Sequence, residues 1–277
     1  MTSSDRPRLD TIDSLALVGA GKMGGAMLEG WLTLGLKPQA VSIFDPSLSP
    51  EIATLAQRGI ALNPTPGAAG KASIVILAVK PQIAADVMPS VAALTGAQTL
   101  VLSVMAGKTL HFLEAALPGA AIARAMPNTP AAIGRGITVL VPNAKVTPAQ
   151  RAIATDLISA TGKVEWIEDE TLMDAVTAVS GSGPAYIFLL AEALASAGIA
   201  AGLPKELAER LARETVAGSG ELLYRSPLDP ATLRKNVTSP GGTTAAALEI
   251  LMGPGGFDAL LKQAVAAASK RSKELAG

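Results

Sequence analysis

The sequence contains no cysteine and only one histidine, His111, among its 277 residues. Without cysteine there can be no disulfide framework and no thiolate chemistry, and one histidine excludes a histidine-rich metal site. Aromatic residues make up only 3% of the chain, and charged residues 17%. Lysine plus arginine equals aspartate plus glutamate at 23 each, so no basic surplus favours nucleic acid or an anionic membrane. We therefore expect no bound metal, no nucleic acid and no membrane partner.

The first 14 residues are polar and charged and lack the apolar core of a signal peptide, which predicts a disordered tail on a cytoplasmic protein. The most hydrophobic stretch, residues 185–203, is long enough to span a bilayer. However, it contains Glu192 near its centre, and no basic cluster flanks it. A helix buried between subunits explains this stretch better, and a chain with 49% hydrophobic residues suits an obligate oligomer.

Residues 15–168 alternate between short β-rich apolar runs and helical patterns, which predicts a parallel, doubly wound α/β sheet. The expected strands are Leu15–Val18, Val41–Phe44, Ile74–Val79, Thr99–Val104, Ala121–Ala125 and Ile137–Val141. From residue 169 to residue 277 such runs vanish, and long helices rich in alanine and leucine follow. The sequence therefore predicts a second, all-helical domain.

The expected helices of the second domain begin with one over residues 172–200. Ser180-Gly181-Ser182-Gly183-Pro184 lies inside it, and the proline removes a helical hydrogen bond. Both a kink that improves packing and a helix bent around a ligand agree with this pattern. Another helix is expected to have Pro204 at its first position. A third follows Thr244, and a last one runs from about residue 256 to 275.

A glycine-rich turn, Gly19-Ala20-Gly21-Lys22-Met23-Gly24, stands between the first expected strand and a helical pattern. This context makes the G-x-G-x-x-G pattern a credible dinucleotide-binding fingerprint. The first glycine permits the tight turn, the second lets a pyrophosphate approach the backbone, and the third lets the helix pack close to the strand.

Polar, glycine-rich or proline-rich segments follow the other early strands. In open α/β sheets, ligands bind beyond the carboxyl ends of the strands, so these segments should gather around one ligand. Asp45 closes the second strand, where an acidic residue commonly binds the adenosine ribose 2′-OH and repels a 2′-phosphate. A turn residue before Pro46 is the alternative role for Asp45. An acidic run, Glu165, Glu168, Asp169 and Glu170, is expected to form a solvated loop and helix start rather than an acid–base pair.

The segment Asn236-Val237-Thr238-Ser239-Pro240-Gly241-Gly242-Thr243-Thr244 contains four hydroxyls, two glycines and no charge, and a helical pattern follows it. A glycine turn before a helix leaves backbone N–H groups pointing one way, which suits an anion. Such a loop can hold a small carboxylate without any arginine or lysine. The alternative is an ordinary helix cap made by Thr243 or Thr244.

Together, these motifs resemble those of pyrroline-5-carboxylate reductases. The resemblance is carried by the glycine fingerprint, by Ala78-Val79-Lys80-Pro81, by Arg124-Ala125-Met126-Pro127-Asn128-Thr129-Pro130, by Val179-Ser180-Gly181-Ser182-Gly183-Pro184-Ala185-Tyr186 and by Val237–Thr244. It covers nearly the whole chain after residue 14, and the Ser-Pro-Gly-Gly-x-Thr element is specific to that family.

The resemblance implies a Rossmann domain followed by a helical dimerisation domain, a homo-oligomer that includes rings of dimers, and NADP(H) as cofactor, with NAD(H) as competitor. It implies that the last step of proline biosynthesis, reduction of 1-pyrroline-5-carboxylate, takes place here. Thr244 matches the threonine that hydrogen-bonds the ring nitrogen. The expected substrate-binding residues are Ser180, Ser239, Gly241, Gly242, Thr243 and Thr244. The expected cofactor-binding residues are Gly19, Ala20, Gly21, Lys22, Met23, Gly24, Asp45, Ala78, Val79, Lys80, Pro81, Met126 and Asn128.

A cyclic imine can arrive already protonated, so its reduction needs no strong acid from the enzyme. This agrees with a site that offers hydroxyls but no His–Asp pair. A β-hydroxyacid dehydrogenase is a rival interpretation, but no lysine stands between Lys163 and Lys205 to serve as its catalytic lysine. A reductase for another cyclic imine and a non-catalytic nucleotide sensor are two further alternatives.

Overall fold

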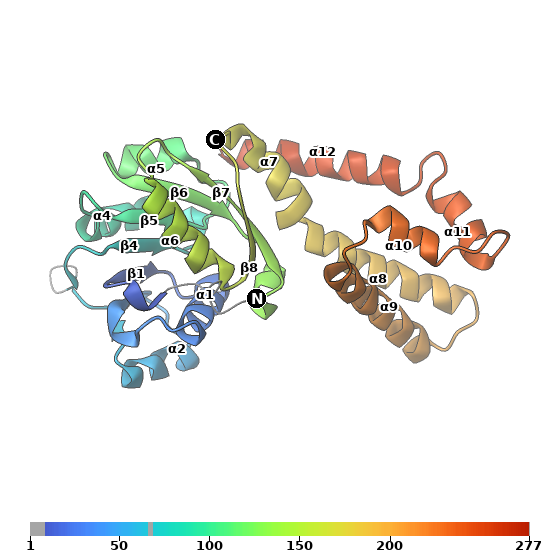
Figure 1. Ribbon diagram of the computed structural model, residues 1–277, viewed down its shortest axis with the longest axis horizontal. Helices are drawn as coiled ribbons and strands as arrows, with labels where there is room; N and C mark the ends of the chain where they lie inside the picture. Colours follow the sequence, from blue (N-terminus) through green and yellow to red (C-terminus); the bar gives the residue numbers. More distant parts are fainter. Residues whose placement is uncertain (1–8, 66–68, 277) are drawn as a thin grey trace. The chain divides into compact units, whose positions relative to one another are not determined.

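The computed structural model describes residues 9–65 and 69–276. The chain forms two compact units: the first runs up to Gly181 and resumes at Lys270, and the second is Ser182–Ser269 (Figure 1). The sequence predicted a boundary between residues 168 and 169. The two divisions differ over residues 169–181 and over the C-terminal residues, which the structure groups with the sheet.

An eight-stranded sheet forms the centre of the first unit, in the order β3-β2-β1-β4-β5-β6-β7-β8. Its strands are β1 (Leu15–Val18), β2 (Val41–Phe44), β3 (Ala61–Leu62), β4 (Ile74–Leu77), β5 (Leu100–Ser103), β6 (Ala121–Met126), β7 (Gly136–Pro142) and β8 (Gly162–Trp166). All neighbours run parallel except β6 and β7. The expected α/β fold with a doubly wound, mostly parallel sheet is confirmed, and among the described strands β6 and β7 form its one antiparallel pair.

The direction of β7 follows from the length of the connection before it. Residues 127–135 join β6 to β7, whereas a parallel pair needs a crossover of a dozen or more residues. Strands β3 and β8 were not predicted. β3 has only two residues, and β8 is an edge strand with the polar Lys163 and Glu165 exposed on one face.

Helices of the first unit alternate with the strands. They are the 3-10 turns η2 (Leu9–Thr11), η3 (Pro38–Ala40), η4 (Leu55–Arg58), η5 (Pro81–Ile83), η6 (Thr129–Ile133) and η7 (Glu170–Leu172), the α-helices α1 (Lys22–Thr33), α2 (Pro50–Thr54), α4 (Ala84–Leu94), α5 (Leu110–Ala116), α6 (Pro148–Ser159) and α7 (Met173–Val176), and the π-helical turn η8 (Thr177–Gly181).

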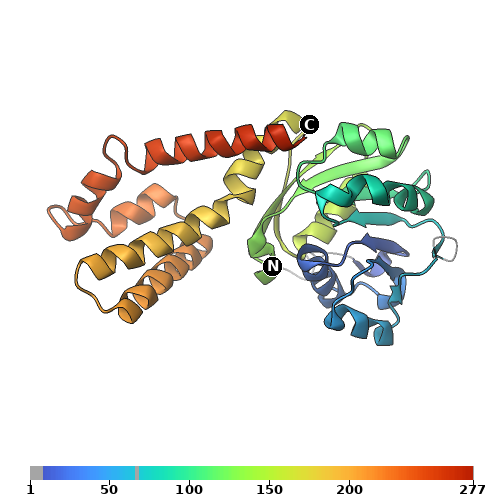
Figure 2. The same cartoon turned by 180° about the vertical axis from the view of Figure 1, so that it is seen from behind.

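Two helical layers enclose the sheet because its central strands are apolar on both faces. Leu15 and Leu17 of β1 pack in one cluster with side chains of α1 and α6, whereas Ala16 and Val18 pack in another with α4 and α5. The two views in Figure 1 and Figure 2 show these layers. Trp31 of α1 ties two helices of one layer, since its Nε1 donates to the carbonyl of Leu157 in α6 over 2.8 Å.

The expected disordered tail was too long. Residues 9–11 form η2, and Leu9 and Ile12 are buried in the cluster that includes α1. The polar composition of this stretch hid two apolar side chains whose burial is favourable enough to order it. Residues 1–8 of the expected tail lie outside the described residues.

The single helix expected over residues 172–200 is interrupted. After η7 and α7, the chain makes the π-helical turn η8, and α8 begins only at Gly183 with Pro184 in its first turn. A proline is tolerated at that position because no helical partner is needed for its missing N–H. Short π-helical turns inside helices are frequent at functional sites.

The second unit is entirely helical in its described residues. It comprises α8 (Gly183–Ala200), α9 (Lys205–Arg225), α10 (Pro230–Asn236), α11 (Thr243–Leu251) and most of α12 (Phe257–Ala276). Helices α8 and α9 approach closely at Gly198, where an added Cβ would lie only 3.3 Å from the Cβ of Ala208. Pro204 caps α9 rather than opening it, and α10 was not predicted.

Large apolar side chains are widely exposed on this unit. Phe188 and Leu189 of α8 each expose 62% of their surface, and Ile187 exposes 49%. By length and composition alone, the helical segment 170–200 is long and apolar enough to cross a membrane. None of its most apolar stretch of 18 residues is buried within the chain. The unit therefore presents more apolar surface than a free monomer ordinarily exposes.

Candidate functional site

The glycine fingerprint forms a tight turn at the carboxyl end of β1. Gly19 has a φ of +93°, and its N–H donates to the carbonyl of Phe44 over 2.9 Å. A Cβ added at Gly24 would lie 2.2 Å from the carbonyl oxygen of Gly19, so this glycine permits the turn and α1 to touch. These two glycines have the structural roles that the sequence predicted for them.

Gly21 differs from these two glycines because the space around it is open. Within the described chain, no atom outside its immediate neighbours comes within 4 Å of the position that a Cβ would occupy. Gly21 is also the N-cap of α1, and no described side chain caps that helix. The first turn of α1 therefore has uncapped backbone amides beside an open space, which fits an anionic group such as a pyrophosphate.

The end of β4 lies directly beside this turn. A Cβ at Gly19 would lie 2.7 Å from the carbonyl atoms of Ala78 and 2.8 Å from the nitrogen of Val79. Lys80 follows in an exposed position and is the N-cap of η5, which begins with Pro81. The structure thus brings Ala78 and Val79 against the fingerprint.

Asp45 joins the same edge from the end of β2. Its Oδ2 accepts from the N–H of Ala20 over 2.7 Å, and its Oδ1 accepts from the N–H of Ser47 over 2.8 Å. The second bond makes the local turn that the sequence left as one role for Asp45. The first bond was not predicted, and it ties the end of β2 to the fingerprint.

Asn128, Met126 and Ser180 lie together at the end of β6. The Nδ2 of Asn128 donates to the Oγ of Ser180 over 3.2 Å. A Cβ at Gly181 would lie 2.4 Å from the Cε of Met126. The loop after β6 therefore packs against the π-helical turn, although the sequence analysis assigned Ser180 to the substrate and the other two residues to the cofactor.

An ion pair that the sequence analysis missed anchors the start of the same segment. Arg124 of β6 is 5% exposed, and its Nη1 lies 2.6 Å from the Oε1 of Glu170. The same oxygen accepts from the N–H of Leu110 over 2.8 Å. The expectation of a solvated acidic run is therefore wrong for Glu170. An arginine inside an otherwise apolar strand was the available signal, because a buried charge needs a partner.

The neighbouring acidic residue, Asp169, agrees better with the expectation of a solvated loop and helix start. It is exposed and caps η7, accepting from both the N–H and the hydroxyl of Thr171. These two bonds lower the pKa of the Asp169 carboxyl below its ordinary value.

The hydroxyl-rich loop lies in the second unit, between α10 and α11. Its turn closes through the N–H of Gly242, which donates to the carbonyl of Ser239 over 3.0 Å, and Gly241 has a φ of +67°. Helix α11 begins at Thr243, so Gly242 is its N-cap, and no side chain in the described part of the protein caps it. The alternative in which Thr243 or Thr244 caps this helix is therefore wrong.

Two features of this loop matter for a ligand. Thr244 is half-buried, whereas Ser239 and Thr243 are exposed. Thr238 is engaged elsewhere, since its hydroxyl donates to the carbonyl of Arg234 over 2.7 Å. The uncapped first turn of α11 thus offers backbone amides beside the hydroxyls of Ser239, Thr243 and Thr244.

Helix α10, which leads into this loop, begins with a strong cap. Asp229 accepts from both the N–H and the hydroxyl of Thr232 over 3.0 and 2.7 Å. Of these bonds, the one from the Thr232 hydroxyl contributes most, and together they lower the pKa of the Asp229 carboxyl below its ordinary value.

The predicted cofactor residues all belong to the first unit, and of the predicted substrate residues only Ser180 belongs to it.

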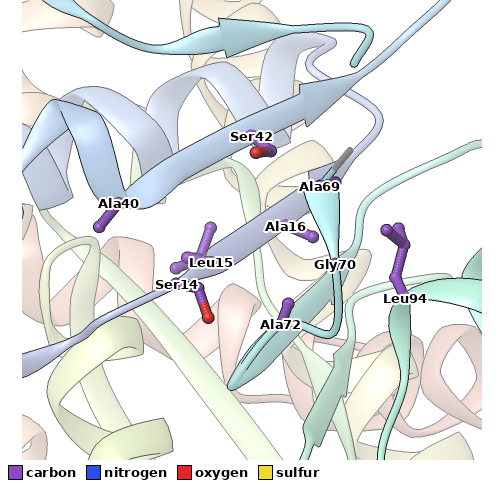
Figure 3. A pocket seen from close by; sticks show the side chains of 9 residues that line it. All are labelled: Ser14, Leu15, Ala16, Ala40, Ser42, Ala69, Gly70, Ala72 and Leu94. Carbon is purple, nitrogen blue, oxygen red and sulfur yellow. The ribbon is translucent and has the colours of Figure 1, made fainter. Parts of the chain in front are cut away.

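A small cavity lies at the opposite end of the sheet. It measures about 20 Å³ and is lined by Ser14, Leu15, Ala16, Ala40, Ser42, Ala69, Gly70, Ala72 and Leu94 (Figure 3). These residues include the amino end of β1, whereas ligands of such sheets bind beyond the carboxyl ends. The cavity has room for about one water molecule. Among the described residues, no group of three or more His, Asp or Glu side chains is arranged to hold a metal ion.

Two family models match the chain. Residues 170–275 match a model described as pyrroline-5-carboxylate reductase dimerisation, and residues 14–107 match one described as NADP oxidoreductase, coenzyme F420-dependent. The two matches fall on the helical part and on the fingerprint part of the fold, respectively.

Curated relatives and solved structures agree with these matches. The chain is 40% identical to a pyrroline-5-carboxylate reductase from Pseudomonas aeruginosa over 264 residues, which cover 95% of this chain and 96% of the relative. A solved pyrroline-5-carboxylate reductase from Coxiella burnetii superposes with a TM-score of 0.89 at 34% identity, covering 96% of this chain and 100% of that one. A Plasmodium falciparum pyrroline carboxylate reductase with NADP bound superposes with a TM-score of 0.79 at 30% identity, covering 97% and 99%.

The similarity therefore extends over nearly the whole length of this chain and of each relative, and it includes both units of the fold. The motifs that suggested the resemblance lie at the carboxyl edge of the sheet, at η8 with the start of α8, and at the start of α11. On these grounds, the chain belongs to the pyrroline-5-carboxylate reductase family.

Proposed function

We propose that this chain carries out the reaction of its family, the NAD(P)H-dependent reduction of 1-pyrroline-5-carboxylate to L-proline, and that the Ser239–Thr244 loop holds the substrate. The observation that carries the second part is the uncapped start of α11 directly after a loop without charged residues. The first part rests on the family membership described above. The reaction is the last step of proline biosynthesis.

The dinucleotide is expected to bind at the carboxyl edge of the sheet. The open space at Gly21 and the uncapped amides of α1 suit its pyrophosphate, while Ala78 and Val79 border the same turn. When bound, the reduced cofactor supplies the hydride. The NADP-bound relative and the NADP oxidoreductase model support NADP(H), and Asp45 keeps NAD(H) as a competitor.

The substrate carboxylate is expected to rest on the start of α11. The amides of the first turn of α11, from Thr243 onwards, point along the helix axis, and the positive end of the helix dipole favours an anion. Ser239 and Thr243 add neutral hydroxyl donors to the same place. This arrangement lets the loop hold a carboxylate without a nearby cation, which would oppose the positive charge of a protonated imine.

Thr244 is expected to orient the ring through its nitrogen. It stands in the first turn of α11, is half-buried and does not cap the helix, so its hydroxyl is available to a ligand. Because the imine arrives protonated, the protein contributes mainly position rather than proton transfer. Holding the reacting carbon at the distance needed for hydride transfer can supply several kcal/mol of catalysis.

The second unit is expected to be a dimerisation module. The matched family model names this role, and the exposed side chains of α8 supply an apolar surface. We further propose that dimers assemble into rings, that the protein is cytoplasmic, and that the long apolar helix lies between subunits rather than in a membrane. The balanced charge of the chain supports the absence of nucleic acid as a partner.

The direct test follows the absorbance of NADPH or NADH in the presence of 1-pyrroline-5-carboxylate, with proline measured as product. Substrate-dependent loss of absorbance with stoichiometric proline is expected. A panel of cyclic imines of other ring sizes, with and without the carboxylate, serves as the control. Faster turnover of an imine that lacks the carboxylate would contradict the proposed role of the loop.

A further inference from the structure

The backbone at Asn63 is unusual. Among the residues that the structure describes, it is the one non-glycine residue with a positive φ, at +46°. It directly follows the short strand β3, which is the first strand in the sheet order, so Asn63 lies at the same carboxyl ends of the strands as the fingerprint. Asparagine tolerates this left-handed conformation better than most residues, but the conformation is still uncommon.

The side chain of Asn63 makes two hydrogen bonds with the backbone of Asp45, and this pair of bonds is called the clasp. Its Oδ1 accepts from the N–H of Asp45 over 2.9 Å, and its Nδ2 donates to the carbonyl of Asp45 over 2.9 Å. Its own N–H donates to the carbonyl of Ile43 over 2.7 Å. The backbone N–H of Asn63 therefore continues the β2–β3 pairing by one more residue, while its side-chain amide bonds the backbone of Asp45.

The carboxylate of Asp45 is held as firmly as its backbone. One oxygen accepts from the N–H of Ala20 and the other from the N–H of Ser47, over 2.7 and 2.8 Å. Four hydrogen bonds therefore determine the position and the orientation of this one residue. Each carboxylate oxygen can accept a further bond, since an ionised carboxylate offers about four acceptor sites.

Asp45 also stands where cofactor choice is made in this class of sheet. It closes β2, and it follows Gly24 by about 20 residues, the spacing at which an acidic residue accepts from the adenosine ribose 2′-OH. A hydroxyl at that position can donate to the carboxylate, whereas a 2′-phosphate cannot donate and is repelled. A fixed carboxylate discriminates between these groups more strongly than one that can turn away.

We propose that Asn63 is a positioning residue for cofactor choice: by clasping Asp45, it holds a negative charge at the ribose site and weakens NADPH binding relative to NADH binding. The proposal rests on the proposed use of a nicotinamide dinucleotide, but not on the identity of the imine. Asn63 itself touches neither the fingerprint nor the carboxylate in the hydrogen bonds described, so it acts through Asp45.

The test compares Asn63→Gly with the wild type. Glycine accepts the positive φ but lacks the side-chain amide, so the substitution removes the clasp with little backbone strain. Dissociation constants for NADPH and NADH are measured by fluorescence titration of the full chain without substrate, and kcat/KM is measured for both cofactors. We expect the preference for NADPH over NADH to rise by roughly three- to tenfold in both measurements.

Two further variants complete the experiment. Asn63→Ser also lacks the side-chain amide and adds no charge beside Asp45, and it replaces Asn63→Gly if that variant does not fold, as judged by its thermal transition. Asp45→Asn removes the charge itself and sets the largest attainable shift in preference. In the Asp45→Asn background, the change at Asn63 should shift the preference no further.

The outcomes separate the two hypotheses. An unchanged NADPH-to-NADH ratio in both Asn63 variants, beside a clear shift in Asp45→Asn, would overturn the role of Asn63. An unchanged ratio in Asp45→Asn would overturn it as well, because the carboxylate would then not face the ribose. Wild-type protein that binds both dinucleotides but reduces no 1-pyrroline-5-carboxylate would contradict the proposed function. It would leave the role of Asn63 standing, since the binding titrations contain no imine.

Discussion

The side chain of Asn128 links two loops through opposite ends of its amide. Its Nδ2 donates to the hydroxyl of Ser180 over 3.2 Å, while its Oδ1 accepts from the N–H of Ile137 over 3.0 Å. The second bond fixes which end of the amide faces Ser180, because a backbone N–H can only donate. The hydrogen of the Ser180 hydroxyl is therefore directed away from Asn128 and is available to a ligand.

We expect Asn128→Ala to lower kcat/KM by roughly tenfold through the loss of this orientation. Ser180→Ala should cause a similar loss. The double variant should lose no more kcat/KM than the more damaging single variant, since both substitutions break the same Asn128–Ser180 hydrogen bond. The measurement is steady-state kinetics on all four proteins. Fully additive losses would show that the two residues act independently.

Thr244→Ala should lower kcat/KM by roughly ten- to several-hundred-fold, about the loss of one neutral or charge-assisted hydrogen bond. Thr244→Ser keeps the hydroxyl and is the matched control, which should retain most of the activity. The thermal transition should change little, because Thr244 does not cap α11. Unchanged kcat/KM in Thr244→Ala would remove this residue from the substrate site.

The fingerprint glycines should separate folding from binding. Gly24→Ala places a methyl group against the carbonyl of Gly19 and should reduce the free energy of unfolding by about 1–3 kcal/mol. Gly21→Ala meets open space, so it should leave stability within about 0.5 kcal/mol while raising the Kd for NADPH by roughly tenfold or more. Denaturant unfolding and cofactor titration measure the two effects. Tight NADPH binding by Gly21→Ala would contradict the expected path of the pyrophosphate.

Two glutamates, each paired with an arginine, should differ in their importance. Glu170→Gln weakens the partner of the buried Arg124 and should lower the free energy of unfolding by about 2–3 kcal/mol. Glu168 pairs with Arg151 but is 74% exposed, so Glu168→Gln should change stability by less than about 1 kcal/mol. Chemical denaturation of both variants tests the comparison, and equal effects would argue against a special role for the buried pair.

Phe188→Glu should weaken the expected dimer. This side chain is 62% exposed within the chain, and a charge there is costly if α8 packs against a second copy. Light scattering after size exclusion should show a lower mass than for the wild type. Ile153→Glu, a similar change on α6 of the first unit, is the control and should leave the mass unchanged. A full-sized oligomer from Phe188→Glu would place the interface elsewhere.

Local patterns were most reliable where a short apolar run is bounded by special residues. The expected strands Leu15–Val18 and Val41–Phe44 have the bounds found in the structure, because glycine and Asp-Pro segments end them sharply. The uncapped turn before α11 was also visible as a Gly-Gly pair. By contrast, β3 has two residues and no such pattern, so nothing in the sequence distinguished it from a loop.

By itself, the sequence determined the alternation of strands and helices, the glycine turn and the hydroxyl loop, because hydrophobic period and turn chemistry are local properties of the chain. Only the tertiary structure decided which distant residues meet: Asp45 with Asn63, Arg124 with Glu170, and Asn128 with Ser180. Such contacts depend on the path of the whole chain. The physical reason is that a hydrogen bond between distant residues needs both groups at one place, and the packing of the sheet and its helices brings them there.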